Sequence, residues 1–262
     1  MVLSSAAKTI NLNIKTYTMK KIILSFVLLV AVFSMASAQD VTVINDKNAQ
    51  ARTVGSFHGI KVSNAFDVII QQGSSEGVVV SASEEKFRSR IKTEVINGVL
   101  RISYDNDNKI WKWSNENRKL KAYVSVKNLD LIDVSGACDV KVDGVLKGGK
   151  LKVDLSGASS LKGELNYTDL VVDQSGASDA NIKGRVTNLT IDVSGASDFK
   201  GFDLVTENCK AEASGASDIR ITVNKDLRAN ASGASDIEYK GSAMISDFKT
   251  SGASSLKKRS SK

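Results

Sequence analysis

The sequence predicts an all-β protein, a parallel β-helix (β-solenoid) with coils of about 19 residues. Two observations predict this fold class. A motif close to SGASD recurs seven times in the second half of the chain, and the residues around each copy alternate between apolar and polar side chains. Repeats of this period indicate stacked coils, and alternation with a period of two indicates strands.

The copies of the motif are almost evenly spaced. They begin at Ser135, Ser156, Ser175, Ser194, Ser214, Ser232 and Ser251, so neighbouring copies are 21, 19, 19, 20, 18 and 19 residues apart. Seven copies make six steps, and strands stack at about 4.8 Å, so we expect the array to be about 29 Å tall.

The residues before each motif have the pattern of a strand. Leu151, Val153 and Leu155 share one face, whereas Lys152 and Asp154 share the other. A shorter apolar run after each motif predicts a second strand, which often ends near a glycine. These glycines are Gly144, Gly163, Gly184, Gly201 and Gly241. The motif is therefore predicted to be a corner between two strands.

The composition of the corner follows from stacking, because each residue lies next to its copy in the neighbouring coil. A tight corner can require a positive φ or leave no room for a Cβ, which only glycine accepts. The corner glycines are Gly136, Gly157, Gly176, Gly195, Gly215, Gly233 and Gly252. We expect the alanine that follows to point inward, where only a methyl group fits, and the first serine to hydrogen-bond backbone groups of the corner.

The domain organisation is predicted as four segments: a leader at 1–38, a β-rich part of the same stack at 39–129, the repetitive β-helix at 130–256 and a basic tail at 257–262. The β-rich part contains Asn97-Gly98, a hairpin signal. Exposed strand edges promote aggregation, so we expect this part to protect one end of the stack and the basic tail to protect the other.

The leader predicts export. Residues 19–38 combine a charged start, a 12-residue apolar stretch at 22–33 and the small residues Ala36-Ser37-Ala38, which is the pattern of a cleaved signal peptide. Cleavage is expected before Gln39 and would leave no transmembrane span. An uncleaved anchor is the alternative. The predicted location is the periplasm, the outer membrane surface or the extracellular space.

The charge distribution argues against nucleic-acid binding. The formal charge of +7 falls to +3 without the four lysines of the leader, and residues 257–262 contribute +4, so the body carries about −1. Nucleic-acid binding proteins instead cluster positive charge on one face. Cys138 and Cys209 lie several coils apart, too far for a disulfide, and are expected to be free thiols, Cys209 as a small buried apolar residue.

Three stretches carry a family resemblance. "FHGIKVSNAFDVIIQQG", "NGVLRISYD" and the serial "SGASD" corners together resemble the bacterial secreted family of autotransporter adhesins called the head GIN domain, over roughly residues 57–252. The resemblance implies a parallel β-helix with a surface or adhesive role. It supplies no catalytic residues to carry over.

The corner aspartates are a candidate metal site. Asp179, Asp198, Asp218 and Asp236 are expected to form successive rungs of one ladder. Like charges this close repel, which a bound calcium ion or nearby bases such as Lys183, Lys200 and Arg220 could relieve. We favour the bases, because the sequence lacks the glycine-rich nonapeptide of calcium-binding β-rolls. No cofactor is therefore expected, with calcium as the alternative.

Trp111 and Trp113 are the candidate ligand-binding residues. They lie two positions apart, so on a strand they would share one face and could form a stacking platform for a sugar or a peptide. The alternative is that they cover the open end of the apolar core.

The sequence favours a non-catalytic role. It contains no hydrolase or phosphate-binding motif, and its single histidine, His58, has no evident partner. The predicted function is an exported binding or structural module of the cell envelope that presents a rigid, repetitive surface to a glycan or protein partner. The alternative is a β-helix polysaccharide lyase or hydrolase with an active site in an unrecognised groove.

Overall fold

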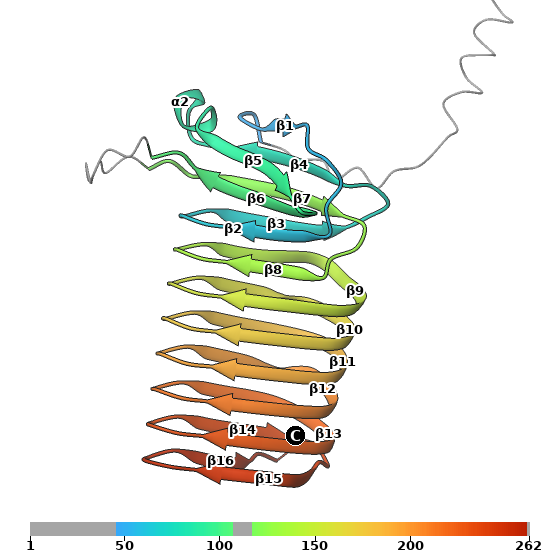
Figure 1. The fold of residues 1–262 in the computed structure, drawn as a ribbon, viewed down its shortest axis with the longest axis vertical. Helices are drawn as coiled ribbons and strands as arrows, with labels where there is room; N and C mark the ends of the chain where they lie inside the picture. Colours follow the sequence, from blue (N-terminus) through green and yellow to red (C-terminus); the bar gives the residue numbers. More distant parts are fainter. Residues whose placement is uncertain (1–45, 107–116, 261–262) are drawn as a thin grey trace, which may run out of the picture. The chain divides into compact units, whose positions relative to one another are not determined.

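Stacked coils dominate the structure, a computed structural model that describes residues 46–106 and 117–260 (Figure 1). The described residues lie in one compact unit, Ile44–Lys262. The coils pair in parallel with one another, so the predicted parallel β-helix is confirmed. The leader at 1–38 lies outside the described residues. The described part of the chain holds no helix of the length and hydropathy that crossing a bilayer requires.

Each repetitive coil consists of one long strand that bends and returns to the next corner. These strands are β9 (Asp139–Leu155), β10 (Ser160–Gln174), β11 (Asp179–Val193), β12 (Asp198–Ala213) and β13 (Asp218–Ala231). The expectation of two separate strands per coil was therefore wrong. Register shifts occur at Gly163 and in the segment 181–184, where a bulge with glycine bends the strand without ending it.

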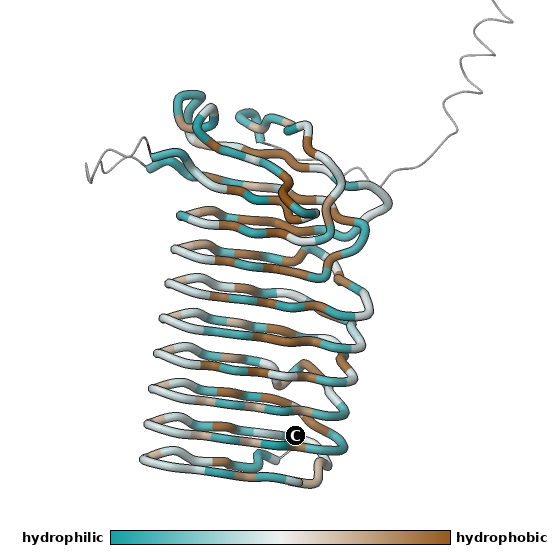
Figure 2. Tube along the Cα trace, viewed as in Figure 1, coloured by the Kyte–Doolittle hydropathy of each residue, from teal (hydrophilic) through white to brown (hydrophobic). Residues whose placement is uncertain are grey.

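The core is built from columns of inward-facing side chains. Leu151, Leu170, Leu189, Cys209 and Leu227 occupy one register position in successive coils, and all are buried. Burying each leucine contributes about 1.5–3 kcal/mol. Cys209 is a free thiol inside this column, as predicted. Apolar residues recur along both sides of each coil, and the corners between them are pale (Figure 2).

The seven corner glycines all have positive φ, between 73° and 88°. At six of the seven corners the amide of the following alanine donates to the glycine carbonyl of the neighbouring coil. For example, Ala196 N donates to Gly176 O at 2.8 Å. A Cβ on Gly195 would lie only 2.4 Å from Gly176 O. Glycine is therefore required both by the backbone conformation and by the stacking, as predicted.

The expectation that the corner alanine points inward was wrong. Ala196 is exposed, whereas Ser197, the fourth residue of the motif, is buried. A hydroxyl inside the corner can donate to carbonyl groups of its own corner and of the preceding coil. In the next coil, Ser217 Oγ donates to Val193 O and to Ser214 O, at 3.2 and 2.9 Å.

An eighth corner precedes the seven in the sequence. It joins β2 (Gly59–Val62) to β3 (Asp67–Gln72) and has Asn64 in place of glycine, with φ of 83°. Ala137 N donates to Asn64 O at 2.7 Å, the same bond that links the later corners. The family stretch "SNAFD" is therefore a divergent copy of the SGASD motif.

The order of coils in space differs from their order in the sequence. The coil of β2 and β3 lies between two others. On one side are β8 (Leu131–Val134) and β9, and on the other are β6 (Val99–Tyr104) and β7 (Lys121–Val126), all parallel to it.

Antiparallel strands and a short helix cap this end of the stack. They are β1 (Gln50–Arg52), β4 (Gly77–Ser81), α2 (Glu85–Arg88) and β5 (Ile91–Ile96). β4 pairs with β7 and β1 with β4, while β5 forms a hairpin with β6 across Asn97-Gly98, as predicted. Phe87 of α2 is buried in the core. The expected protection of this end is confirmed.

The other end of the stack is built differently. After β14 (Asp236–Lys240), the chain forms β15 (Met244–Thr250) and β16 (Ser255–Lys258), which we call the end coil. β15 pairs only with β13, and β16 pairs only with β14, among the described residues. Lys257 and Lys258 belong to β16, so the basic segment extends the last coil and does not cover its edge.

Candidate functional site

The corner aspartates occupy one register position. Asp179 pairs with Asp198, Asp198 with Asp218, and Asp218 with Asp236. Bases two residues further along the strands bind them. Lys200 Nζ lies 2.8 Å from Asp179 and 3.3 Å from Asp198. Repulsion along the ladder is therefore offset by ion pairs.

The bases that bind the ladder differ in part from those expected. Arg220 contacts Asp218 at 2.9 Å, but Lys183 pairs with Glu164 instead. Hydrogen bonding to Asp179 raises the pKa of Lys200, since it stabilises the ammonium form. Among the residues that the structure describes, no group of three acidic, histidine or cysteine side chains is placed to hold a metal ion.

A second acidic ladder lies on the strand that enters each corner, two residues before the motif. It consists of Asp133, Asp154, Asp173, Asp192 and Glu212. Lys152 bridges Asp154 and Asp173 at 2.7 and 3.2 Å. The ladder borders a shallow groove of about 290 Å³. Burial, and then the charges of Glu212 and Asp173, raise the pKa of Asp192.

Sequence reasoning missed this second ladder, although the signal was present. An acid stands two positions before the motif in five successive copies. The alternation was interpreted only as the polar face of a strand. Aligning that face from coil to coil would have revealed the ladder, because stacked coils place copies side by side.

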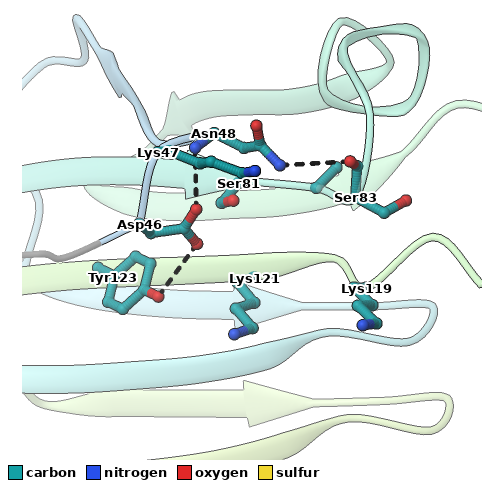
Figure 3. A pocket seen from close by; sticks show the side chains of 9 residues that line it. Asp46, Lys47, Asn48, Ser81, Ser83, Lys119, Lys121 and Tyr123 are labelled. Atoms are coloured by element: carbon teal, nitrogen blue, oxygen red, sulfur yellow. Dashed lines mark hydrogen bonds between the residues drawn. The ribbon is translucent and has the colours of Figure 1, made fainter.

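A larger cleft opens in the N-terminal cap (Figure 3). It has a volume of about 440 Å³, which we call the N-terminal cleft. Its lining comes from the segment before β1, from β4 and the residues after it, and from β7 and the residues before it. The lining residues are Asp46, Lys47, Asn48, Ser81, Ala82, Ser83, Lys119, Lys121 and Tyr123.

Hydrogen bonds fix one wall of the N-terminal cleft. The amide of Asn48 donates to the Asp46 carboxylate at 3.0 Å, and the Tyr123 hydroxyl donates to it at 3.4 Å. Asn48 Nδ2 also donates to Ser83 O at 3.2 Å. Burial alone would raise the pKa of Asp46, but these donors, Ser81 and the charge of Lys121 outweigh it and lower the pKa.

The cleft carries excess positive charge. Three lysines line it, namely Lys47, Lys119 and Lys121, against the single carboxylate of Asp46. None of the three forms an ion pair with another described residue. The Ser83 hydroxyl is buried and has no hydrogen-bond partner in the described part of the chain. The arrangement can therefore accept an anionic group and donate a hydrogen bond to it.

Two predictions about single residues have different outcomes. Trp111 and Trp113 lie outside the described residues, so their role as a stacking platform stays a prediction. His58 was expected to have no partner, and this was wrong: its Nδ1 lies 2.8 Å from a carboxylate oxygen of Asp130. The two residues are 72 positions apart, so only the stacking of β2 on β8 brings them together.

Comparisons with solved structures support the fold. A structure described as a putative adhesin of Bacteroides fragilis superposes with a TM-score of 0.75 at 20% identity, covering 80% of this chain and 96% of that one. A protein of Parabacteroides distasonis described as a putative lipid binding protein gives a TM-score of 0.57 at 21% identity, covering 82% and 98%.

A further structure from Parabacteroides distasonis, described as a putative adhesin, gives a TM-score of 0.56 at 18% identity, covering 80% and 96%. At these identities the likeness shows the fold alone. A search among curated proteins finds no match.

The sequence profile of one protein family matches most of the chain. The family is described as "Putative auto-transporter adhesin, head GIN domain", and the match spans residues 56–243. These residues include the Asn64 corner, six of the seven glycine corners and both strands that frame the N-terminal cleft, β4 and β7. The chain therefore belongs to this family, the head GIN domain family.

Proposed function

We propose that the protein is an exported, non-catalytic binding module of the cell envelope, and that it holds an acidic glycan in the N-terminal cleft. The predicted signal peptide at 19–38 supports export. Membership of an adhesin family supports binding as the function. The choice of ligand rests on the three lysines that line the cleft. None of them has an ion-pair partner among the described residues.

The dimensions of the cleft favour a saccharide over a protein surface. A volume of about 440 Å³ lies within the range of small-ligand sites, about 300–1,000 Å³. Serine hydroxyls and the Asn48 amide offer the mixture of donors and acceptors that sugar hydroxyls require. The lysines would select for a carboxylate on the sugar, such as that of a uronic acid, through charge.

The coils would act as a rigid support for this site. Each strand from β3 to β14 along the stack is hydrogen-bonded to the next one in parallel. Rigid presentation lowers the ordering cost of binding, so that weak contacts add to affinity. Trp111 and Trp113 enter this proposal as a second contact for the same ligand, because their segment joins β6 to β7 and Lys119 follows it in the sequence.

Binding of an oligouronate to the purified chain tests the proposal. We expect isothermal titration calorimetry to detect binding that weakens as salt rises from about 50 to about 500 mM. Over this range the Debye length falls from about 14 to about 4 Å, so that screening changes from weak to strong. A Lys119→Gln/Lys121→Gln variant should lose at least about tenfold in affinity, which corresponds to about 1.4 kcal/mol. A Trp111→Ala/Trp113→Ala variant tests the second contact.

The matched control removes two lysines outside the cleft. Lys127→Gln/Lys150→Gln has the same net charge as the cleft variant but should bind like the unmodified chain. Equal losses in both variants would mean that non-specific attraction drives binding and would contradict the cleft site. Preference for a neutral glycan would contradict the role of the lysines. Cleavage of the saccharide would favour the enzyme alternative.

A further inference from the structure

The end coil leaves the core of the stack open. Ile245 pairs in register with Leu227, and Phe248 with Ala229, so both continue columns that face the interior. Leu227 and Ala229 are 0% and 4% exposed, whereas Ile245 and Phe248 are 41% and 44% exposed. In the described part of the chain, nothing packs against these inward-facing apolar side chains from the far side.

The edges of both strands in the end coil are also open. Each of β15 and β16 has a strand on one side only among the described residues. An open edge beside exposed apolar residues is the usual site of strand addition, and soluble proteins commonly cover it. The capped end differs, because β5 there carries the alternating charges of Lys92 and Glu94. The family match ends at residue 243, just before β15 begins.

The charges on β15 indicate which kind of partner strand fits the end coil. Asp247 and Lys249 flank Phe248 on the outward face, and neither forms an ion pair with another described residue. Consider two copies of β15 paired antiparallel about a two-fold axis at Phe248. Each Asp247 then lies opposite Lys249 of the second copy, and the two Phe248 rings lie opposite each other, facing the shared core.

We infer that the end coil is a self-association surface, on which a second copy of this chain adds end to end in a two-fold symmetric, antiparallel arrangement. The same strand is then used by both copies, as a two-fold interface requires. The two-fold axis runs perpendicular to the sheet, so it also brings β16 alongside its own copy. The cores of the two stacks become continuous across Phe248, Ile245 and their copies.

This arrangement leaves the N-terminal cap of each copy outside the interface, because the cap and the end coil lie at opposite ends of the same stack of strands. A dimer would therefore carry two copies of any site in the cap. Two linked sites can raise the avidity for a repetitive ligand well above the affinity of one site. The inference does not depend on the identity of that ligand.

Charge reversal tests both the dimer and its register. We expect sedimentation equilibrium of the purified chain to show a monomer and a dimer in exchange. Asp247→Lys and Lys249→Asp should each weaken dimerisation about tenfold or more, because each places like charges opposite one another twice. The double variant Asp247→Lys/Lys249→Asp restores opposite charges and should dimerise to within about threefold of the unmodified chain.

A cysteine on the two-fold axis gives an independent measurement. Of the residues of β15, only residue 248 lies opposite its own copy in the inferred register, so Phe248→Cys should form an intermolecular disulfide under mild oxidation, whereas Thr250→Cys should not. The native Cys138 and Cys209 are buried and should not interfere. Phe248→Asp places two carboxylates opposite each other at the interface and should weaken dimerisation. Its control is Ile96→Asp, which alters an exposed apolar residue of the cap and should leave dimerisation unchanged.

The possible outcomes separate clearly. A monomer at every concentration in sedimentation, without cross-linking of Phe248→Cys, overturns the inference. A dimer that is indifferent to the single charge reversals, or that the double variant does not restore, places the interface elsewhere and also overturns it. Circular dichroism of each variant shows that the coils remain folded, so that a loss of dimer is assigned to the interface.

Discussion

Replacing Gly195 by alanine tests why the corners repeat. Gly195 has φ of +77°, and a Cβ there would lie 2.4 Å from Gly176 O and 3.0 Å from Gly176 N in the preceding coil. The same carbonyl accepts the hydrogen bond from Ala196 N at 2.8 Å. The substitution therefore strains the backbone of one coil and pushes against the backbone of the next.

The expected loss of stability has two parts. Holding alanine in the left-handed conformation costs about 1–2 kcal/mol. A carbon and an oxygen normally approach no closer than about 3.3 Å, so the two corners must separate by nearly 1 Å. That movement weakens the bond from Ala196 N, and a typical hydrogen bond contributes about 0.5–1.5 kcal/mol net. We expect Gly195→Ala to lower the free energy of unfolding by about 1.5–3.5 kcal/mol.

Substitutions at two other glycines separate the cost of the backbone conformation from the cost of the contact with the neighbouring coil. Gly144 has φ of +79°, but a Cβ there would meet nothing within 4 Å, so Gly144→Ala should cost only the backbone part, about 1–2 kcal/mol. At Gly149 a Cβ would also meet nothing within 4 Å, and its φ lies outside the left-handed region. Gly149→Ala should leave the stability unchanged or raise it by up to about 1 kcal/mol.

Urea unfolding followed by circular dichroism measures the series. The three variants should retain the slope of the free energy against urea, so that differences in midpoint report stability. A Gly195→Ala variant no less stable than Gly144→Ala would refute the stacking argument, because the backbone conformation alone would then explain the glycine. Coils of a solenoid can unfold in parts, so agreement between two spectroscopic probes is also needed.

Three further predictions concern single side chains. Cys138 and Cys209 should resist a thiol reagent at pH 8 until denaturant is added, because burial raises the pKa of both thiols. Asp192→Asn should raise the free energy of unfolding at pH 7 by less than about 1 kcal/mol. The pKa of Asp192 is raised in the folded state, so the folded state binds the proton more tightly and the gain should disappear as the pH falls below the ordinary value of 3.8. Denaturant titrations at pH 7 and pH 3 measure it. Ser217→Ala removes two hydrogen bonds inside a corner and should cost about 1–2 kcal/mol, while Ser246→Ala, in exposed β15, should cost nothing measurable by the same method.

The corners were predictable because their requirements are local. Positive φ and close stacking both demand glycine, and the repetition of that demand is visible as a period. Asn64 was missed because asparagine also tolerates positive φ, so the eighth corner does not spell the motif. The inward residue was misassigned because alanine and serine are both small. Which of the two faces the core depends on the backbone conformation of the corner, and the stacking of the coils fixes that conformation.

The candidate site was much less predictable. The N-terminal cleft combines residues near 46, 81 and 120, which the period does not relate to one another. They meet because the coil of β6 and β7 stacks on the coil of β2 and β3, out of sequence order, and β4 then pairs with β7. Likewise, His58 finds Asp130 only through the pairing of β2 with β8.

By itself, the sequence determined the repeated coil: its length, the alternation that fills the core, and the glycine at each corner. These features depend on contacts between a residue and its own copy, which the period reveals. The tertiary structure alone decided the order of the first coils, the closure of one end and the opening of the other. Those depend on pairing between unlike segments, and backbone hydrogen bonds, which any strand can form, leave little trace of the partner in the sequence.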